Sequence, residues 1–261
     1  RREKGQDTHG TMKLRSSVMN EEMISSAELS RAACCNLGES FVTNPSVDVS
    51  YSDAATGAKQ IKLLGLSGTY VQMLTENIPN YRGAASPYGL GYVPGPWMQS
   101  IQVSKGISSV KNGYEAITGQ INVEFKKPQL PEADWVSANL FASSTNRYEA
   151  NADATLKLSK RWGTSLLAHY ENETKAHDGN DDGFVDIPQV EQYNLWNRWA
   201  YMGDHYVFQA GFKALSESRT SGQAHHTDMQ TGDLYKVGID TERYELFTKN
   251  AYIFNKEKNT N

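Results

Sequence analysis

The clearest chemical signal in this sequence lies between residues 177 and 186. Acidic and amide side chains alternate there with other residues and end at Gly183, which matches the D-x-N-x-D-G start of a calcium-binding loop. The candidate calcium ligands are Asp178, Asn180, Asp182, Phe184 through its carbonyl, and Asp186. The twelfth position is Gln189 rather than glutamate, so the bidentate ligand is missing unless Glu191 replaces it. The alternative is a solvated turn rich in Asp and Asn.

A second group of metal-ligating types follows further along the chain. His225 and His226, with Asp228 and Met229, could bind copper, iron or haem. Exposed histidine pairs more often bind nothing, and we favour that interpretation. The sequence contains no nucleophile with a base at a recognisable spacing and no phosphate-binding loop, so an enzyme is unsupported.

Composition excludes several further classes of function. The 261 residues carry 26 Lys+Arg against 30 Asp+Glu, and a net charge of −4 predicts no nucleic-acid partner. The two cysteines are adjacent, at Cys34 and Cys35, so they cannot build a disulfide framework, and we expect buried free thiols. A hydrophobic content of 38% is low for a compact globule, and tyrosine outnumbers phenylalanine, 14 to 8. This bias is typical of surfaces with one apolar side and one wet side.

Up to about residue 131 the pattern predicts a small α+β unit. Ser25 and Ser26 open a helix expected over 27–41, where apolar residues recur at helical spacing. Short β-like runs separated by glycine or proline turns follow at 46–51, 60–64, 69–74, 100–104 and 120–125.

From residue 134 onward the period becomes two. Between 147 and 159, Ala, Leu and Tyr occupy one face and charged or amide residues the other. The same alternation predicts six antiparallel strands, most of them long enough to cross a bilayer when tilted. They are expected at 136–142, 147–159, 164–172, 193–201, 205–215 and 243–254.

The connections between these strands alternate in length. Short turns at 159–163 and 202–204 alternate with long polar loops at 175–192 and 217–241, and the short loop at 144–147 breaks the rule. Long strands with an apolar outer face and alternating short and long connections indicate an incomplete transmembrane β-barrel. A soluble sheet with one wet face is the alternative, but it would place more Leu, Ile and Val on its buried face.

Several motifs resemble those of one known family. Residues 101–106 (IQVSKG) and 108–123 (SSVKNGYEAITGQINV) resemble "IEVvrGpaSalyGsgAiGGvInI", residues 60–66 resemble "irirGl", and 71–79 resemble "vlvDGvP". These are motifs of the TonB-dependent outer-membrane receptors, in particular the Bacteroidetes type. Asn77 stands where the family often has glycine, and Gly119 is single where two glycines are usual.

The resemblance implies a linker at 1–20, a plug domain at 21–131 and the first part of a transmembrane barrel at 132–261. It implies a Gram-negative outer membrane, outer-membrane lipid around the barrel, and a TonB-type energy-transducing complex as partner. The cargo would be an external small ligand such as a siderophore, haem, a metal complex, cobalamin or a glycan. No cofactor is required, although Ca²⁺ is a candidate. A non-transporting surface-binding or adhesion protein is the alternative.

No TonB box or signal peptide is recognisable, and the sequence starts without Met and stops after a strand-like run, so we expect a fragment.

The resemblance also places candidate sites. Residues 80–97 would rise to the plug apex, where a proline and glycine frame holds aromatics in place. The expected ligand contacts are Tyr81, Arg82, Tyr88 and Tyr92. Alternatively, these aromatics pack the apex against the barrel wall. The expected hinge or turn glycines are Gly106, Gly113 and Gly119, which could equally be ordinary turn residues.

Overall fold

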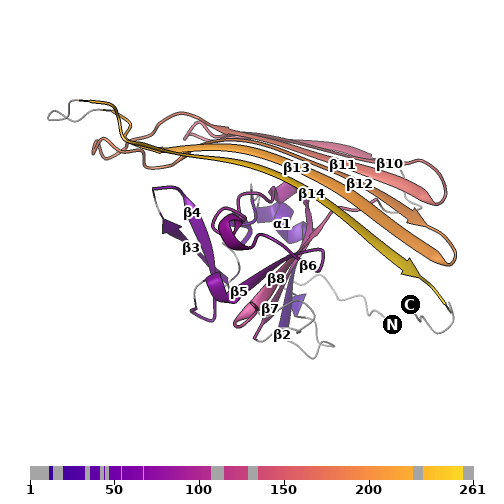
Figure 1. Ribbon diagram of the computed structural model, residues 1–261. Coiled ribbons are helices and arrows are strands. Elements are labelled where there is room, and N and C mark those ends of the chain that lie inside the picture. The colour runs from indigo at the N-terminus through magenta and orange to yellow at the C-terminus, as the bar shows by residue number, and fades with distance from the viewer. Residues whose placement is uncertain are drawn as a thin grey trace. The chain divides into compact units, whose positions relative to one another are not determined.

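The computed structural model describes residues 12–13, 20–32, 36–41, 44, 47–53, 55–66, 68–106, 115–128, 135–225 and 232–254 (Figure 1). The chain divides into two compact units. The first comprises Arg1–Ser52 and Ala58–Lys126, and the second comprises Asp53–Gly57 and Lys127–Asn261. Cys34, Cys35, Gly113, His226, Asp228 and Met229 lie outside the described residues.

The first unit is built on a six-stranded sheet with the order β1-β2-β7-β8-β5-β6. β5 and β8 run parallel, and the other neighbours run antiparallel. Its strands are β1 (Met12–Lys13), β2 (Asn20–Ser25), β5 (Val71–Thr75), β6 (Ile78–Pro79), β7 (Met98–Lys105) and β8 (Gly119–Phe125). A separate hairpin pairs β3 (Val47–Asp53) with β4 (Ala58–Leu63).

One face of the central strands forms the core of the first unit. Ile101 and Val103 of β7 and Ile121 and Val123 of β8 are completely buried, because alternate residues of paired strands share a face. Phe125 extends this row, and its ring meets Trp97 edge-on at 6.2 Å. The five β-like runs expected from the sequence in this half are therefore strands, and the mixed α+β character is confirmed.

The helix expected over 27–41 is shorter than its apolar spacing suggested. Helix α1 covers Ser26–Ala32, with the Ser25 hydroxyl accepting a hydrogen bond from the Glu28 amide at 3.4 Å as an N-cap. Asn36 starts a separate turn, since its side chain accepts from the Glu39 amide and donates to the Glu39 carboxylate. This local capping favours the 3₁₀ helix η1 (Glu39–Phe41) over a continued α-helix. The other 3₁₀ helices are η2 (Gly68–Tyr70), η3 (Gly83–Ala85) and η4 (Gly95–Trp97).

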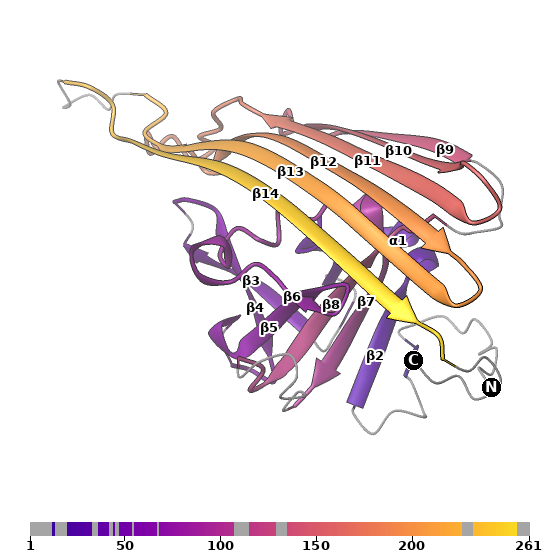
Figure 2. The same cartoon turned by 45° about the vertical axis from the view of Figure 1, so that its right-hand side comes forward.

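The second unit is one antiparallel sheet with neighbours in chain order, β14-β13-β12-β11-β10-β9, as Figure 2 shows. The strands are β9 (Trp135–Ala142), β10 (Tyr148–Lys157), β11 (Trp162–Glu173), β12 (Gln189–Met202), β13 (Tyr206–Gly222) and β14 (Lys236–Tyr252). The six expected strands are all present, and they form the unclosed part of a barrel that the alternation predicted.

The prediction of a long loop at 217–241 was wrong in its bounds. Pairing between β13 and β14 continues as far as Gly222 and Lys236, so the connection is only residues 223–235. The strand ends were missed because Ser216, Ser218 and Asp240 place polar residues on the face that is apolar elsewhere. A strand with two polar faces has no hydrophobic period to reveal it.

The helices in the described part of the chain are all too short and too polar to span a lipid bilayer.

Candidate functional site

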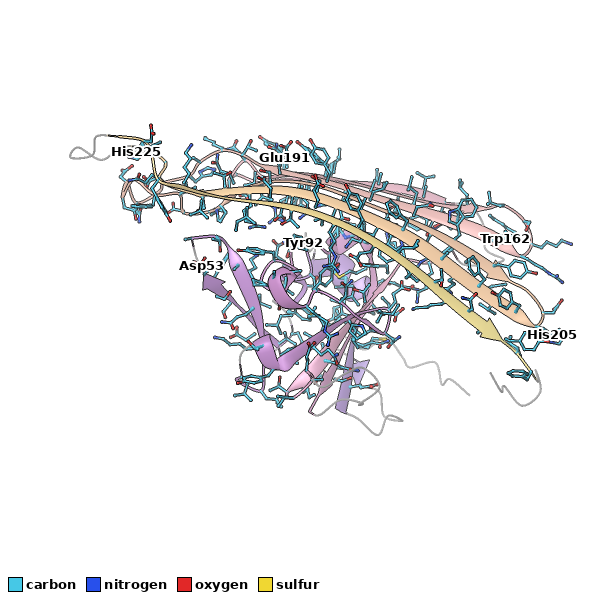
Figure 3. All side chains as sticks on the ribbon, viewed as in Figure 1. Asp53, Tyr92, Trp162, Glu191, His205 and His225 are labelled. Atoms are coloured by element: carbon cyan, nitrogen blue, oxygen red, sulfur yellow. The ribbon has the colours of Figure 1, made fainter. Side chains whose placement is uncertain are left out.

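The segment after β6 carries the four residues expected to contact a ligand. Tyr81 and Tyr92 are 3% and 1% exposed, and their rings approach to 6.2 Å (Figure 3 labels Tyr92). Gly89 makes this packing possible, since a Cβ there would lie 2.6 Å from the Tyr81 Cβ. Tyr81 also has a positive φ of 53°. These two tyrosines form the buried frame of the segment.

Arg82 and Tyr88 are the more accessible members of the set. The Arg82 Nε lies 2.8 Å from a Glu115 carboxylate oxygen, and the two side chains are 46% and 29% exposed. Tyr88 is half-buried. The segment therefore offers a solvent-facing guanidinium and a phenol on a buried aromatic frame, a combination that can bind anionic or aromatic groups. Ligand contact by these residues stays a prediction.

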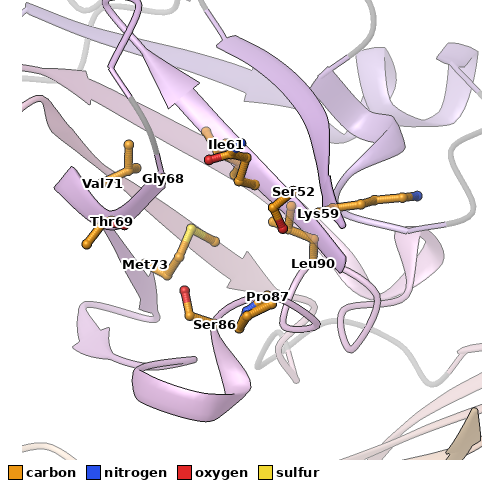
Figure 4. Close-up of a pocket in the computed structure, with 11 residues that line it drawn as sticks. Ser52, Lys59, Ile61, Gly68, Thr69, Val71, Met73, Ser86, Pro87 and Leu90 are labelled. Atoms are coloured by element: carbon orange, nitrogen blue, oxygen red, sulfur yellow. The ribbon is translucent and has the colours of Figure 1, made fainter. Parts of the chain in front are cut away.

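A cavity of about 220 Å³ lies beside this segment, within the first unit (Figure 4). Hydroxyl groups of Ser52, Thr69 and Ser86 and the apolar side chains of Ile61 and Met73 line it. Ligand sites for drug-sized molecules usually exceed about 300 Å³, so this cavity is large enough only for a small group.

Two of the three expected hinge glycines are described, and they lie at the same end of the β7–β8 pair, one residue out of register. Gly119 pairs with Lys105, the residue before Gly106, and the Gly106 amide donates to the Thr118 carbonyl at 2.8 Å. Gly106 has a φ of +92° with open space around it, whereas a Cβ on Gly119 would lie 2.2 Å from the Ser104 carbonyl oxygen. Gly106 is required by its backbone angle, and Gly119, with a φ of +157°, is required mainly by the close approach of the Ser104 carbonyl. A hinge role remains a prediction.

The acidic loop of the second unit is ordered by its own side chains. The two Asp178 carboxylate oxygens accept from the Asp182 and Gly183 amides at 3.1 and 2.8 Å. The Asn180 oxygen accepts from the Asp182 amide, and Asp182 accepts from the Phe184 amide. The Asp186 carboxylate accepts from the Gly179 amide at 2.6 Å.

These bonds bring the candidate calcium ligands onto one compact turn. In the described residues, no group of three or more His, Cys, Asp or Glu side chains is placed to hold a metal ion. Each carboxylate oxygen keeps a second lone pair beyond the bond it accepts, so the loop retains acceptor capacity. Calcium binding is not tested by this geometry and stays a prediction.

Sequence reasoning missed a row of buried polar side chains on one face of the second unit. The register aligns Glu149, Glu171, Gln192 and Glu217 across β10, β11, β12 and β13. Arg147 lies between the first two carboxylates, with nitrogens 2.6 Å from a Glu149 oxygen and 3.1 Å from a Glu171 oxygen. Gln192 donates to Glu217 at 2.7 Å. The polar alternation signalled a wet face, but only the register shows which charges meet.

The opposite face of this sheet is exposed and apolar. It includes Val136, Leu140, Leu195, Phe212 and Leu246, which are 39–81% exposed. An exposed apolar face extending over six strands is far larger than the patches found on soluble monomers.

Aromatic residues on the exposed face fall into two rows. The pairs Trp162 and Tyr170, Tyr193 and Tyr201, and Tyr244 and Tyr252 are each eight residues apart on β11, β12 and β14. Neighbouring members touch, with ring centroids 5.1 Å apart for Trp162 and Tyr201 and 4.9 Å apart for Tyr170 and Tyr193. Eight residues span about 26 Å along a strand, or about 20 Å at a tilt near 40°. This is close to the roughly 25 Å height of the apolar band on membrane barrels.

Comparison with protein families gives a match within the first half of the chain. Residues 13–120 match the family described as TonB-dependent Receptor Plug Domain. The comparison with curated proteins gives no match.

Solved structures with the same fold cover both units. The ferripyoverdine receptor of the outer membrane of Pseudomonas aeruginosa aligns with a TM-score of 0.71 over 94% of this chain, at 15% identity. The copper transporter OprC gives 0.65 over 91%, at 15% identity, and the alcaligin outer-membrane receptor FauA from Bordetella pertussis gives 0.68 over 92%, at 13% identity. The aligned part covers 34%, 34% and 37% of those three chains, so this chain spans about a third of their length. At these identities the likeness establishes the fold.

Proposed function

Since residues 13–120 are a TonB-dependent receptor plug domain and an unclosed sheet of barrel strands follows, we propose that this chain is part of an outer-membrane receptor that imports a scarce ligand. In this proposal the ligand binds from outside and an inner-membrane TonB-type complex supplies the energy to move the plug. The matched structures include a copper transporter, a ferripyoverdine receptor and an alcaligin receptor, so metals and metal complexes lead the ligand candidates in this proposal. Haem, cobalamin and glycans stay in the set, and the Bacteroidetes type stays a prediction from the motifs.

The observation that carries the proposal is that the plug domain is followed in the same chain by a sheet with one exposed apolar face. Exposed Leu and Val side chains lie between two aromatic rows whose separation fits the apolar part of a bilayer. The other face carries the polar side chains, as expected for the inner wall of a barrel. A soluble binding protein would have no use for such an outer face.

Energy-dependent uptake is the test. The full-length receptor would be expressed in a Gram-negative strain whose native receptors for these ligands have been deleted. Uptake would be compared with and without a functional TonB complex. Labelled ferric siderophores, haem, copper, cobalamin and oligosaccharides would be supplied one at a time. We expect uptake of one class only when the TonB complex works. Binding that is equally strong in both strains and never leads to uptake would favour the alternative of a surface-binding or adhesion protein.

For ligand contact we propose that Arg82 and Tyr88 touch the ligand, while Tyr81 and Tyr92 hold the segment in shape and reach the ligand only if it opens. The support is the difference in exposure between the two pairs. A guanidinium beside a phenol favours an anionic or aromatic ligand surface.

We also propose Ca²⁺ as a ligand of residues 178–186, on the support of the D-x-N-x-D-G spacing and of the hydrogen bonds that order this turn. Isothermal titration with calcium, on receptor previously treated with a chelator, tests it. Asp182→Asn should weaken binding at least about tenfold because it removes a charged ligand, whereas Asp181→Asn, one residue away, should not. If neither the untreated protein nor the chelator-treated protein binds calcium, the loop is a solvated turn.

A further inference from the structure

The three connections at one end of the second unit's sheet are linked to one another by the middle connection. Residues 143–147 join β9 to β10, residues 174–188 join β11 to β12, and residues 223–235 join β13 to β14. Figure 3 places His225 at this end, while Trp162 and His205 lie at the opposite end beside the short turns. Because neighbouring strands are in chain order, the middle connection lies next to both others.

On one side the middle connection contacts the β9–β10 turn. The His177 Nε2 lies 2.5 Å from the Thr145 carbonyl oxygen. The same turn is closed by the Ser143 amide, which donates to the Arg147 carbonyl at 2.9 Å. The contact therefore attaches the middle connection to a turn that is itself ordered.

On the other side the middle connection adds a short β-ladder to the β13–β14 connection. The Val185 amide donates to the Gly222 carbonyl, and the Ala224 amide donates to the Gly183 carbonyl, both at 2.8 Å. Phe184 and Gln223 form the bridge pair between these two bonds. Main-chain bonds of this kind fix the relative position of two segments more tightly than a side-chain contact does.

Asp178 lies where these two attachments meet. Its side chain is only 6% exposed, and one of its oxygens lies 3.5 Å from the His225 Nδ1 on the β13–β14 connection. The same carboxylate accepts from the Gly183 amide, so it positions the residue whose carbonyl binds Ala224. Its neighbour His177 makes the contact with Thr145. The Asp178 side chain therefore acts directly on the link to the β13–β14 connection, and the residue before it makes the link to the β9–β10 turn.

The middle connection is also closed on itself. The Asp186 amide donates to the His177 carbonyl at 2.7 Å, and the Gly179 amide donates to the Asp186 carboxylate. Positive φ values at Asp181 and Gly183 turn the chain back within this ring. These bonds close residues 177–186 into a ring, and both attachments to the neighbouring connections start from this ring.

We propose that Asp178 is a positioning residue that makes the three connections one cooperative unit, so that they open together and not one at a time. The proposal rests on the proposed function only in treating this end of the sheet as the outward-facing rim. It extends that function, since a ligand that orders one connection would also order the other two through the same linkage.

Hydrogen–deuterium exchange on the full-length receptor, with the ligand absent, tests the coupling without any transport measurement. Asp178→Asn keeps the shape but removes the charge and one acceptor oxygen, and Asp178→Ala removes the side chain. We expect exchange about tenfold faster or more not only at 182–186 but also at 143–147 and 222–225. Amides in the middle of β10 to β13 should keep wild-type rates, which shows that the sheet is folded.

Asp181→Asn is the matched control, because Asp181 is exposed in the same loop and the change removes the same charge. It should leave all three connections at wild-type rates. Faster exchange confined to 178–186 in the Asp178 variants, or equal effects of the Asp178 and Asp181 variants, would overturn the proposal. Each measurement is repeated with calcium and with a chelator. The effect of the Asp178 variants must persist in chelator. An effect seen only with calcium would mean that the bound cation links the connections, and it would also overturn the proposal.

Discussion

Replacing Gly119 by alanine should loosen the central strands of the plug domain more than any other glycine change there. Gly119 opens β8 and is paired on both sides, with Lys105 of β7 and Val71 of β5. An added Cβ would lie 2.2 Å from the Ser104 carbonyl oxygen, more than 1 Å inside the 3.4 Å at which ordinary contact begins. The obstructing atom is backbone in a paired strand, so it cannot turn aside as a side chain would.

The size of the effect follows from this geometry. Inserting a methyl group into a packed region costs about 1–3 kcal/mol, and a clash with paired backbone belongs at the upper end. A loss of about 3 kcal/mol corresponds to roughly 100-fold in an opening equilibrium. Gly106→Ala is the matched control. It has open space around it and a φ of +92°, so it should cost only about 1–2 kcal/mol, or 5- to 30-fold.

Amide exchange in β5, β7 and β8 of the protein, under conditions where it reports the opening equilibrium, measures both variants. The expected order is Gly119→Ala fastest, then Gly106→Ala, then wild type. Exchange in the second unit should be unchanged and so reports that the barrel strands are intact. If Gly119→Ala exchanges no faster than Gly106→Ala, close approach is not what requires glycine at 119, and the steric reasoning fails.

Three smaller changes probe the turn after β5, the tip of the β3–β4 hairpin and the segment after β6. Asn77→Ala should cost about 1–2 kcal/mol because Asn77 has a φ of 64°, while Asn77→Gly should cost less; amide exchange in β5 and β6 separates them. The Thr56 hydroxyl lowers the pKa of the exposed Asp53 carboxyl below its ordinary 3.8, so this bond stabilises at neutral pH and is lost as the pH falls through the folded pKa. Thr56→Val should raise that pKa toward 3.8 in an NMR titration, and an unchanged midpoint would rule out the hydroxyl as the cause. Arg82→Gln should change stability by less than about 1 kcal/mol but weaken ligand binding about tenfold, with Glu115→Gln as the variant that spares binding.

The sequence was sufficient to predict the fold wherever the pattern of apolar and polar residues repeats or a local motif marks the end of an element. The period of two revealed six strands because one face is apolar over most of their length, and Ser25 marked the start of α1 because capping chemistry is local. The departure at Asn77 proved compatible with the turn, since asparagine tolerates the positive φ that glycine usually supplies.

The sequence was insufficient wherever the signal depends on partners distant in the chain. Nothing local indicates that Asp178 approaches His225, or that the Phe184 segment pairs with Gln223, because both contacts arise from the meeting of two connections. The outer ends of β13 and β14 were missed for a related reason. They are held by pairing with each other, and pairing leaves no trace in the hydrophobic pattern when both faces are polar.

The two faces of the barrel sheet therefore constrain the sequence in different ways. On the exposed face, a residue such as Leu140 or Leu246 must only be apolar, so each position can vary independently. On the buried face, Glu149 and Glu171 lie directly opposite each other and Arg147 contacts both. Like charges at opposed positions destabilise a sheet, and removing one partner leaves a buried charge uncompensated. Those three positions must therefore change together, and the polar face is the more tightly constrained of the two.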